Sequence, residues 1–321
     1  MRRHHGGREP AMSRIAILIP CYNEAVTIGQ VVDDFKRELP QAAIYVYDNN
    51  STDGTGTIAA EHGAIVRQER RQGKGNVTRQ MFREIEADCY VMVDGDSTYP
   101  ASQVHELIAP VLSGDADMVI GDRMSNGSYG AENERAFHGF GNTLVRNLVN
   151  WLYKADLTDI MTGYRAFSCI FVKSYPVVSS GFEVETEMSI HCLDKKFKVV
   201  QVPIDYRDRP AGSYSKLSTF SDGMLVLKTI ASLCREYRPL LFFGVLALVA
   251  LVVCLACGIP VIAEYAATHF ITRVPLAILA VGSGIVAMLL FSCGLILDSM
   301  AKTARQQYEM EVVRLYSEAR K

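Results

Sequence analysis

Short apolar runs alternate with amphipathic stretches along the first part of the chain. Apolar runs bounded by turn residues are typical of buried strands, and apolar positions three to four apart are typical of helices. The pattern predicts strands at Arg14–Pro20, Ala43–Asp48, Ala64–Gln68, Cys89–Asp94 and Asp117–Gly121. It predicts helices at Ala25–Glu38, Gly54–Glu61, Gly75–Ala87 and Ser102–Leu112. This alternation indicates an α/β fold with a parallel, doubly wound sheet.

The chain changes character after Pro239. Leu240–Ala263 contains 24 residues without a charge, and Leu276–Leu297 contains another 22. A helix needs roughly 20 apolar residues to cross a bilayer core, so each run is long enough to span. Buried helices of a soluble protein are the alternative, but two such runs in tandem favour a transmembrane hairpin.

Basic residues are placed unevenly around the predicted hairpin. The link at 264–275 holds one basic residue, Arg273. The flanks are basic, with Lys228, Arg235 and Arg238 before the first span and Lys302, Arg305, Arg314, Arg320 and Lys321 after the second. By the positive-inside rule both flanks face the cytoplasm. We therefore expect an integral membrane protein with two spans, whose globular domain and both termini are cytoplasmic.

The sequence just before the first span predicts an amphipathic helix. One face of that helix carries Phe220, Met224, Leu227, Ile230 and Cys234. Such a helix suits the surface of the cytoplasmic leaflet, and packing on the globular domain is the alternative. The expected organisation is a disordered extension (1–12), a cytoplasmic catalytic α/β domain (13–212), the interfacial helix (213–238), the transmembrane hairpin (239–298) and a cytoplasmic C-terminal helix (299–321). The spans and the last helix are candidate contacts in a homo-oligomer.

Composition and motifs exclude several classes of function. The formal net charge is −2 and no basic stripe is interleaved with aromatic residues, so nucleic acid is not an expected partner. The first predicted strand is not followed by a dinucleotide fingerprint, and there is no Walker A loop. The eight cysteines show no metal or disulfide framework, and Cys254 and Cys257 lie inside the first predicted span.

The most informative motif is Asp94-Gly95-Asp96, at the end of a predicted buried strand. In open α/β sheets, ligands bind outside the carboxyl ends of the strands. Two carboxylates, with a glycine that permits close backbone approach, suit a hard divalent cation that also holds phosphate oxygens. A polar turn is the alternative. Further acidic residues after neighbouring strands, Asp48 and Asp122, favour a site, since helix capping does not explain an acidic cluster.

Eight motifs carry a family resemblance. They are Ile-Pro-Cys-Tyr-Asn-Glu at 19–24, Asp-Asn-Asn-Ser-Thr-Asp-Gly-Thr at 48–55, Gly-Lys-Gly at 73–75, Asp-Gly-Asp at 94–96, Gly-Asp-Arg at 121–123, Thr-Gly-Tyr-Arg at 162–165, Phe-Glu-Val-Glu-Thr-Glu at 182–187 and Tyr-Arg-Asp-Arg at 206–209. Together they resemble family-2 glycosyltransferases of the GT-A fold. With the two spans, the chain resembles polyprenyl-phosphate glycosyltransferases, the dolichol- or undecaprenyl-phosphate sugar synthases, over about residues 14–300.

The resemblance implies a role for each matching residue. The base and ribose of a nucleotide-sugar donor would be held by Pro20, Tyr22, Glu24 and Asp48. A Mg²⁺ or Mn²⁺ ion on the donor diphosphate would be bound by Asp94 and Asp96. The diphosphate would also be contacted by Lys74, Arg207, Arg209 and Lys216, and the lipid phosphate by Arg123 and Arg135. The catalytic residues would be Asp94, Asp96 and Arg123.

Two positions depart from the family pattern. Thr98 stands where some relatives have an amide side chain beyond the second metal-binding aspartate. Gly139 stands where relatives have a hydroxyl that assists the phosphate-binding arginine. The third metal ligand and the acceptor site are therefore open.

The expected function is transfer of a sugar from a nucleotide-sugar donor to a polyprenyl phosphate at the cytoplasmic leaflet. Such a reaction expels a nucleoside diphosphate, so a metal and nearby cations that stabilise the leaving charge perform the main task. A lipid phosphate is already ionised at neutral pH and attacks without strong base catalysis. The resemblance implies inversion at the anomeric carbon, and it favours a UDP-linked donor carrying GlcNAc or glucose.

Three alternatives stay open. The donor could instead be GDP-mannose. A processive polysaccharide synthase would share the fold, but it normally has a Gln-x-x-Arg-Trp motif, and the only tryptophan here is Trp151, outside that context. A non-catalytic membrane scaffold on a transferase fold predicts that the metal and phosphate groups are broken.

A further acidic cluster consists of Glu183, Glu185 and Glu187. On a helix, Glu183 and Glu187 share one face and Glu185 points elsewhere. We expect one of the three to approach the sugar and the others to be solvated or paired.

Overall fold

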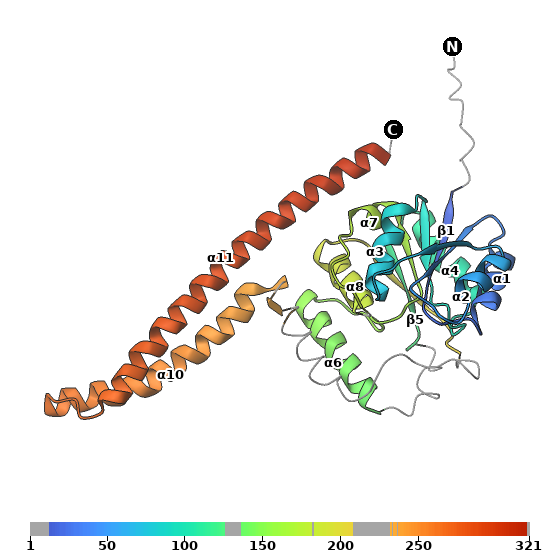
Figure 1. The fold of residues 1–321 in the computed structure, drawn as a ribbon. Coiled ribbons are helices and arrows are strands. Elements are labelled where there is room, and N and C mark those ends of the chain that lie inside the picture. The colour runs from blue at the N-terminus through green and yellow to red at the C-terminus, as the bar shows by residue number, and fades with distance from the viewer. Residues whose placement is uncertain are drawn as a thin grey trace, which may run out of the picture. The chain divides into compact units, whose positions relative to one another are not determined.

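The structure of the chain is a computed structural model that describes residues 13–125, 136–181, 183–207 and 237–319, with positions 232, 234 and 235. The elements of the N-terminal part are shown in Figure 1: β1 (Ile15–Cys21), α1 (Ile28–Glu38), β2 (Ala43–Asp48), α2 (Thr55–Glu61), β3 (Ile65–Gln68), α3 (Lys74–Glu84), β4 (Cys89–Met92), η1 (Ala101–Gln103), α4 (Val104–Leu112), β5 (Met118–Asp122), α6 (Ala136–Tyr153), β6 (Arg165–Ser168), α7 (Cys169–Ser174), α8 (Val184–Asp194) and β7 (Val199–Pro203). Two long helices follow, α10 (Pro239–Thr268) and α11 (Val274–Ala319).

The strands form one seven-stranded sheet in the order β3-β2-β1-β4-β6-β5-β7. All five predicted strands are present in this sheet, which confirms the α/β class. The sheet is mixed rather than wholly parallel, because β6 runs antiparallel to both β4 and β5. As a consequence Arg165, the first residue of β6, is paired with Met92, the last residue of β4. The loop that enters β6 therefore lies at the carboxyl edge of the parallel strands.

The predicted helices are present with shifted ends. α1 begins at Ile28, since residues 25–27 form a turn. α3 ends at Glu84, because Ile85 is extended, with φ −98° and ψ 132°. Neither shift moves a predicted site residue out of its loop.

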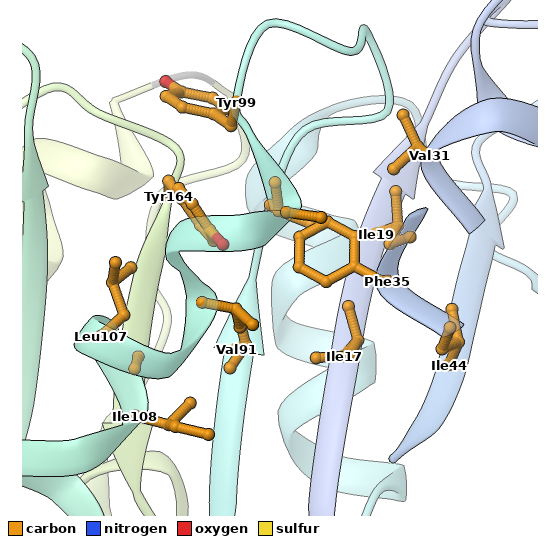
Figure 2. Packing of buried hydrophobic residues seen from close by; sticks show 14 of the residues in the cluster. Ile17, Ile19, Val31, Phe35, Ile44, Val91, Tyr99, Leu107, Ile108 and Tyr164 are labelled. Carbon is orange, nitrogen blue, oxygen red and sulfur yellow. The ribbon is translucent and has the colours of Figure 1, made fainter. Parts of the chain in front are cut away.

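Hydrophobic packing on both faces holds the sheet. Figure 2 shows Ile17, Ile19 and Val91 on one face, close to Phe35 of α1 and to Tyr164. The rings of Phe35 and Tyr164 meet edge to face, with centroids 6.1 Å apart.

A second cluster joins α3, β6 and α7. The ring of Phe167 lies 5.7 Å from that of Phe82 and 5.3 Å from that of Phe171. Close packing of this kind resists deformation, so the strand ends provide fixed positions for side chains.

The chain divides into two compact units, Met1–Thr219 with Val312–Lys321, and Phe220–Glu311. Within the second unit, α10 and α11 expose apolar side chains, and only 6% and 11% of their most apolar windows is buried. Both helices are long and apolar enough to cross a membrane, which supports a membrane protein.

Small residues let α10 and α11 approach each other. A β-carbon added at Gly284 would lie 3.1 Å from Sγ of Cys254, and one at Gly294 would lie 3.1 Å from Cβ of Phe243. Glycines at such contacts are typical of packed membrane helices. The predicted extension at 1–12 lies outside the described residues, and so does almost all of the predicted interfacial helix at 213–238.

Candidate functional site

Hydrogen bonds join the loop after β1 to the loop after β2. The backbone N–H of Asn23 donates to Oγ of Ser51 (2.9 Å), and that of Glu24 donates to Oγ1 of Thr55 (2.9 Å). Asn23 adopts a left-handed conformation, with φ 53°, which asparagine tolerates better than most residues. These bonds hold Glu24 and the neighbouring Tyr22 beside the end of β2.

Asp48 is the last residue of β2, and its carboxylate is buried. It accepts a hydrogen bond from the backbone N–H of Ser51 (3.0 Å). The register of β1 and β2 pairs Asp48 with Cys21, next to Pro20, so both strands end at the same level. Tyr22 is 39% exposed. The edge thus offers an exposed ring and carboxylates, which suit stacking on a base and hydrogen bonding to ribose hydroxyls.

The side chain of Asn49 fixes the loop that leads into α3. Its amide nitrogen donates to the carbonyls of Glu69 (2.7 Å) and Arg71 (2.9 Å), and its oxygen accepts from the N–H of Gly73 (2.7 Å). The next residue, Lys74, is the first of α3. Asn49 therefore sets the position from which the Lys74 side chain extends.

Asp94 and Asp96 follow β4 at the carboxyl edge of the sheet. Asp96 is buried, and one of its oxygens accepts bonds from the N–H (3.2 Å) and hydroxyl (2.7 Å) of Thr98. Thr98 therefore holds Asp96 in place. Thr98 itself stands where the family resemblance implies an amide side chain in some relatives. The Asp94 side chain is 28% exposed and is the more accessible of the two.

Close contacts require glycine at two positions around these carboxylates, one against Cys21 and one against Asp94. A β-carbon at Gly95 would lie 2.7 Å from Sγ of Cys21, and one at Gly163 would lie 2.8 Å from Cγ of Asp94. Both distances are too short for a side chain, so only glycine fits either position without a shift.

Asp94 and Asp96 have the chemistry of a divalent cation site. Carboxylate oxygens are the ligands that Mg²⁺ prefers, and Mg²⁺ is usually held by one or two carboxylates together with substrate phosphates. Among the described residues, no three His, Cys, Asp or Glu side chains cluster to hold a metal alone. The pair therefore fits an ion that arrives with a phosphate-bearing ligand, rather than a closed structural site.

Lys74 lies between two carboxylates. Its Nζ forms an ion pair with Oδ1 of Asp94 and another with Oε1 of Glu185, the latter at 2.5 Å. The Lys74 side chain is only 8% exposed. Burial alone would lower the pKa of Lys74, but Asp94 and Glu185 raise it above its usual range. Lys74 is therefore a fixed cation beside the Asp94 carboxylate.

Glu185 was not among the predicted site residues. Helical spacing grouped Glu183 with Glu187, yet the structure places Glu185 in the site and gives the other two local roles. Glu187 accepts the N–H groups of Val178 (3.0 Å) and Ser179 (2.8 Å). The predicted spacing agrees with these contacts, since Glu185 contacts Lys74 and the other two bond to the backbone at 178–181. Because α8 is buried on nearly all sides, spacing alone did not indicate which of the three glutamates enters the site. Burial raises the pKa of Glu185, while Lys74 acts to lower it.

Arg123 follows β5 and is held by Asp159, which the sequence interpretation also missed. Nε of Arg123 lies 2.7 Å from Oδ2 of Asp159, and a terminal nitrogen lies 3.1 Å from Oδ1. Both side chains are buried, and the guanidinium lies 5.4 Å from the ring centroid of Tyr206. The one available signal is that Asp159 lies three residues before the motif at 162–165.

Tyr99 connects the Asp94 side of the site to the Arg123 side. Its hydroxyl accepts a hydrogen bond from the N–H of Gly163 (3.1 Å), and its ring lies 5.6 Å from that of Tyr206. Burial raises the pKa of Tyr99 above its usual range, so its hydroxyl stays protonated at neutral pH.

Arg165 fixes the loop that carries Asp159 and Gly163. Its guanidinium is fully buried and donates to the carbonyls of Thr162 (3.0 Å) and Ile160 (2.8 Å) and to the hydroxyl of Ser189 (2.9 Å). These bonds tie the loop to α8, the helix that carries Glu185.

The remaining predicted residues are four basic residues, expected at the donor diphosphate and at the acceptor phosphate. Arg135, Arg209 and Lys216 lie outside the described residues. The backbone N–H of Arg207 donates to the carbonyl of Thr98 (2.9 Å), and its side chain is exposed.

Comparison with known proteins agrees with this geometry. Residues 16–172 match the family model described as glycosyl transferase family 2. The chain is 34% identical over 236 residues to glycosyltransferase AglJ of Haloferax volcanii, covering 73% of this chain and 77% of that protein. It is 30% identical over 224 residues to the dolichyl-phosphate hexose transferase of the same organism, covering 70% of this chain and 95% of that protein.

Solved structures share the fold. The crystal structure of Mycobacterium tuberculosis glucosyl-3-phosphoglycerate synthase in complex with Mn²⁺, UDP and phosphoglyceric acid superposes with a TM-score of 0.55 at 23% identity, covering 70% of this chain and 78% of that chain. At this identity the likeness concerns the GT-A fold alone.

Proposed function

Because the chain belongs to glycosyl transferase family 2, we propose that it transfers a sugar from a nucleotide-sugar donor to a polyprenyl phosphate at a membrane surface. The observation that carries the proposal is the convergence of Asp94, Asp96 and Lys74 at the carboxyl edge of the sheet, connected through Tyr99 to Arg123. This arrangement offers an anionic and a cationic region side by side, as a transfer between two phosphate-bearing molecules needs.

The donor would bind over the ends of β1, β2 and β4. The side chains proposed to hold its base and ribose are Pro20, Tyr22, Glu24 and Asp48. A Mg²⁺ or Mn²⁺ ion held by Asp94 and Asp96 would neutralise charge on the diphosphate, both before and after the bond to the sugar breaks. Manganese and UDP occur together in the complex of the M. tuberculosis synthase, which supports this assignment.

The acceptor would lie on the Arg123 side. Asp159 holds the guanidinium in one orientation and Tyr206 covers one of its faces. A cation fixed in this way orients an incoming phosphate and reduces its repulsion from the donor diphosphate. We include Arg135 in the acceptor site, and Arg207, Arg209 and Lys216 on the donor diphosphate, on the family resemblance alone.

A lipid acceptor agrees with two further observations. The chain carries two helices long and apolar enough to span a bilayer, and the 30% identical relative is named a dolichyl-phosphate hexose transferase. We propose that the catalytic domain and both termini face the cytoplasm. The proposed limits are 13–212 for the catalytic domain, 213–238 for the interfacial helix, 239–298 for the hairpin and 299–321 for the C-terminal helix. The phosphate oxygen of the lipid would attack the anomeric carbon with inversion.

The proposed donor is UDP-linked and carries GlcNAc or glucose. The name of the dolichyl-phosphate hexose transferase favours a hexose such as glucose over GlcNAc. Mannose from GDP-mannose is the second candidate. The test is incubation of membranes containing the full chain with Mn²⁺, polyprenyl phosphate and a panel of radiolabelled nucleotide sugars. We expect one donor to label the lipid. Labelling from none would favour the non-catalytic scaffold.

The matched variants are Asp96→Asn and Asp88→Asn. Asp96 lies after the end of β4, whereas Asp88 immediately precedes the same strand and its side chain is 50% exposed. The first substitution should abolish lipid labelling and the second should leave it intact. Undiminished transfer by Asp96→Asn would overturn the metal assignment.

A further inference from the structure

Thr98 donates two hydrogen bonds to one oxygen of Asp96. Its hydroxyl lies 2.7 Å from Oδ1 of Asp96, and its backbone nitrogen lies 3.2 Å from the same atom. Thr98 and Asp96 are 1% and 3% exposed, so both bonds form away from water. Hydrogen bonds are electrostatically stronger inside a protein than in water. Thr98 therefore fixes the orientation of the Asp96 carboxylate.

Helix capping does not explain this pair. An aspartate often accepts the N–H two or three residues later where a helix begins. Here the next helical segment is η1, which begins at Ala101 and has Pro100 as its N-cap. Ser97, between the two residues, adopts a left-handed conformation with φ 63°, which is unfavourable for a residue other than glycine. A strained turn that holds a buried carboxylate is more typical of a functional site than of a simple chain reversal.

A second buried threonine binds the same turn. The hydroxyl of Thr27, the N-cap residue of α1, donates to the carbonyl of Gly95 (2.6 Å). Thr27 and Thr98 thus hold two neighbouring residues of the turn through the same kind of group. They differ in what they hold, because Thr27 binds the backbone and Thr98 binds a carboxylate. This difference allows a role in the fold to be separated from a role at the ion.

The bond to Asp96 has the chemistry of a contact that orients a metal ligand. An ionised carboxylate only accepts hydrogen bonds, and the Thr98 hydroxyl is the donor to it. Groups that donate to a metal ligand set its orientation, and their loss typically costs about 10- to 100-fold in metal affinity or activity. The family resemblance left the third ligand open at this position. In this chain the hydroxyl at that position serves Asp96.

We infer that Thr98 is a positioning residue of the proposed cation site and acts on the ion only through Asp96. This inference rests on the proposed function, because that function puts the ion at Asp94 and Asp96. The side chains offered to the ion are then two carboxylates. Phosphate oxygens of the nucleotide and water are the other ligands that such a site uses.

Binding of Mn²⁺ tests the inference on the purified full chain in detergent, by electron paramagnetic resonance. Titrations use Mn²⁺ alone and Mn²⁺ with UDP or GDP. Thr98→Val replaces the hydroxyl by a methyl group of similar size, and we expect it to lose about tenfold in Mn²⁺ affinity. Thr98→Ser keeps the hydroxyl and should stay within about twofold of wild type. Unchanged affinity in Thr98→Val would overturn the inference.

Thr27→Val is the matched control. It removes the other buried hydroxyl of the turn, so it should lower the melting temperature but keep Mn²⁺ affinity within about twofold. An equal loss of affinity in Thr27→Val and Thr98→Val would mean that both act through the stability of the turn, against the inference. Should Thr98→Val fail to fold, Thr98→Ala is compared with Thr98→Ser, since these two variants differ by the hydroxyl alone.

A double variant distinguishes positioning from direct coordination. Mn²⁺ affinity in the presence of nucleotide is compared between Asp96→Asn and Asp96→Asn with Thr98→Val. The two should agree within about twofold, because an effect that passes through the Asp96 carboxylate is already lost. A further loss of about tenfold would make Thr98 a ligand in its own right and contradict the inference.

Failure of the proposed function has a different signature. Wild type that binds no Mn²⁺ with either nucleotide, or an Asp96→Asn variant that binds it as tightly as wild type, would overturn the metal assignment and the inference together. Binding that depends on Asp96 but not on Thr98 would overturn the inference alone and leave the proposed function standing.

Discussion

The guanidinium of Arg123 and the carboxylate of Asp159 form a bidentate pair, with N···O distances of 2.7 and 3.1 Å, inside the protein. Both side chains are below 10% exposure, so the pair is shielded from water. Removing one partner of such a pair leaves a buried charge without compensation, which costs about 3–5 kcal/mol. Asp159 thus fixes the cation that is proposed to meet the acceptor phosphate.

Asp159→Asn tests this positioning. We expect a lower melting temperature and a rise of about tenfold in the KM for polyprenyl phosphate, the factor that corresponds to 1.4 kcal/mol. Affinity for the nucleotide should change little, because Asp159 does not contact the proposed donor residues. Initial rates at varied acceptor concentration and a nucleotide titration provide the measurement. Asp156→Asn, at an exposed position three residues earlier, is the control.

Gly163→Ala tests the room beside Asp94. The added β-carbon would lie 2.8 Å from Cγ of Asp94, so the carboxylate must shift. A displacement of the order of 1 Å at a reacting centre costs about 100-fold in rate. We expect that loss in transfer, together with weaker Mn²⁺ binding. Gly56→Ala is the control, since its β-carbon would lie 3.6 Å from the nearest atom, and it should retain activity.

Asn49→Ala tests the loop before Lys74. Its side chain makes three hydrogen bonds to the backbone of the loop that precedes α3. At about 1 kcal/mol each, their loss should lower the free energy of unfolding by about 2–3 kcal/mol and weaken donor binding. Chemical unfolding and a donor titration measure the two effects. Normal donor affinity in a destabilised variant would contradict the link to Lys74.

His191 gives a pH dependence of stability. Burial, assisted by Lys195, lowers the pKa of His191 from 6.5 to about 3. Between these values the unfolded chain binds a proton that the folded chain does not, so this group makes stability fall as pH falls, by at most about 1.4 kcal/mol per pH unit. Stability contributed in this way is fully present above pH 6.5.

The variant His191→Gln should therefore have a shallower slope. Melting temperatures of the full chain between pH 7.5 and 5 provide the comparison, each relative to the variant's own value at pH 7.5. Equal slopes for the two proteins would contradict a buried neutral His191.

Local patterns predicted much of this molecule. The five strands and four helices that periodicity predicted are present, because each of them depends mainly on the residues within it. Asp94 and Asp48 could be placed at one sheet edge because parallel strands end together. By contrast, β6 was not predicted, because it has only four residues and its antiparallel pairing with β4 and β5 depends on tertiary contacts.

The missed site residues depend on tertiary contacts. Glu185 is separated from Lys74 by more than half the length of the catalytic domain, and a helical wheel cannot indicate that a nearly all-buried helix turns this side chain toward a lysine. Asp159 lies in a loop whose position depends on the buried Arg165. No spacing within either segment predicts these pairs.

Transfer of label from a nucleotide sugar into a lipid extract is the most direct test of the central claim. The assay uses the purified full chain, polyprenyl phosphate and Mn²⁺, with EDTA in a parallel reaction. We expect a labelled lipid that requires the metal, disappears with Asp94→Asn or Asp96→Asn, and persists with Asp88→Asn. A labelled lipid formed equally well by the Asp94 and Asp96 variants, or formed in EDTA, would contradict the metal site at the end of β4.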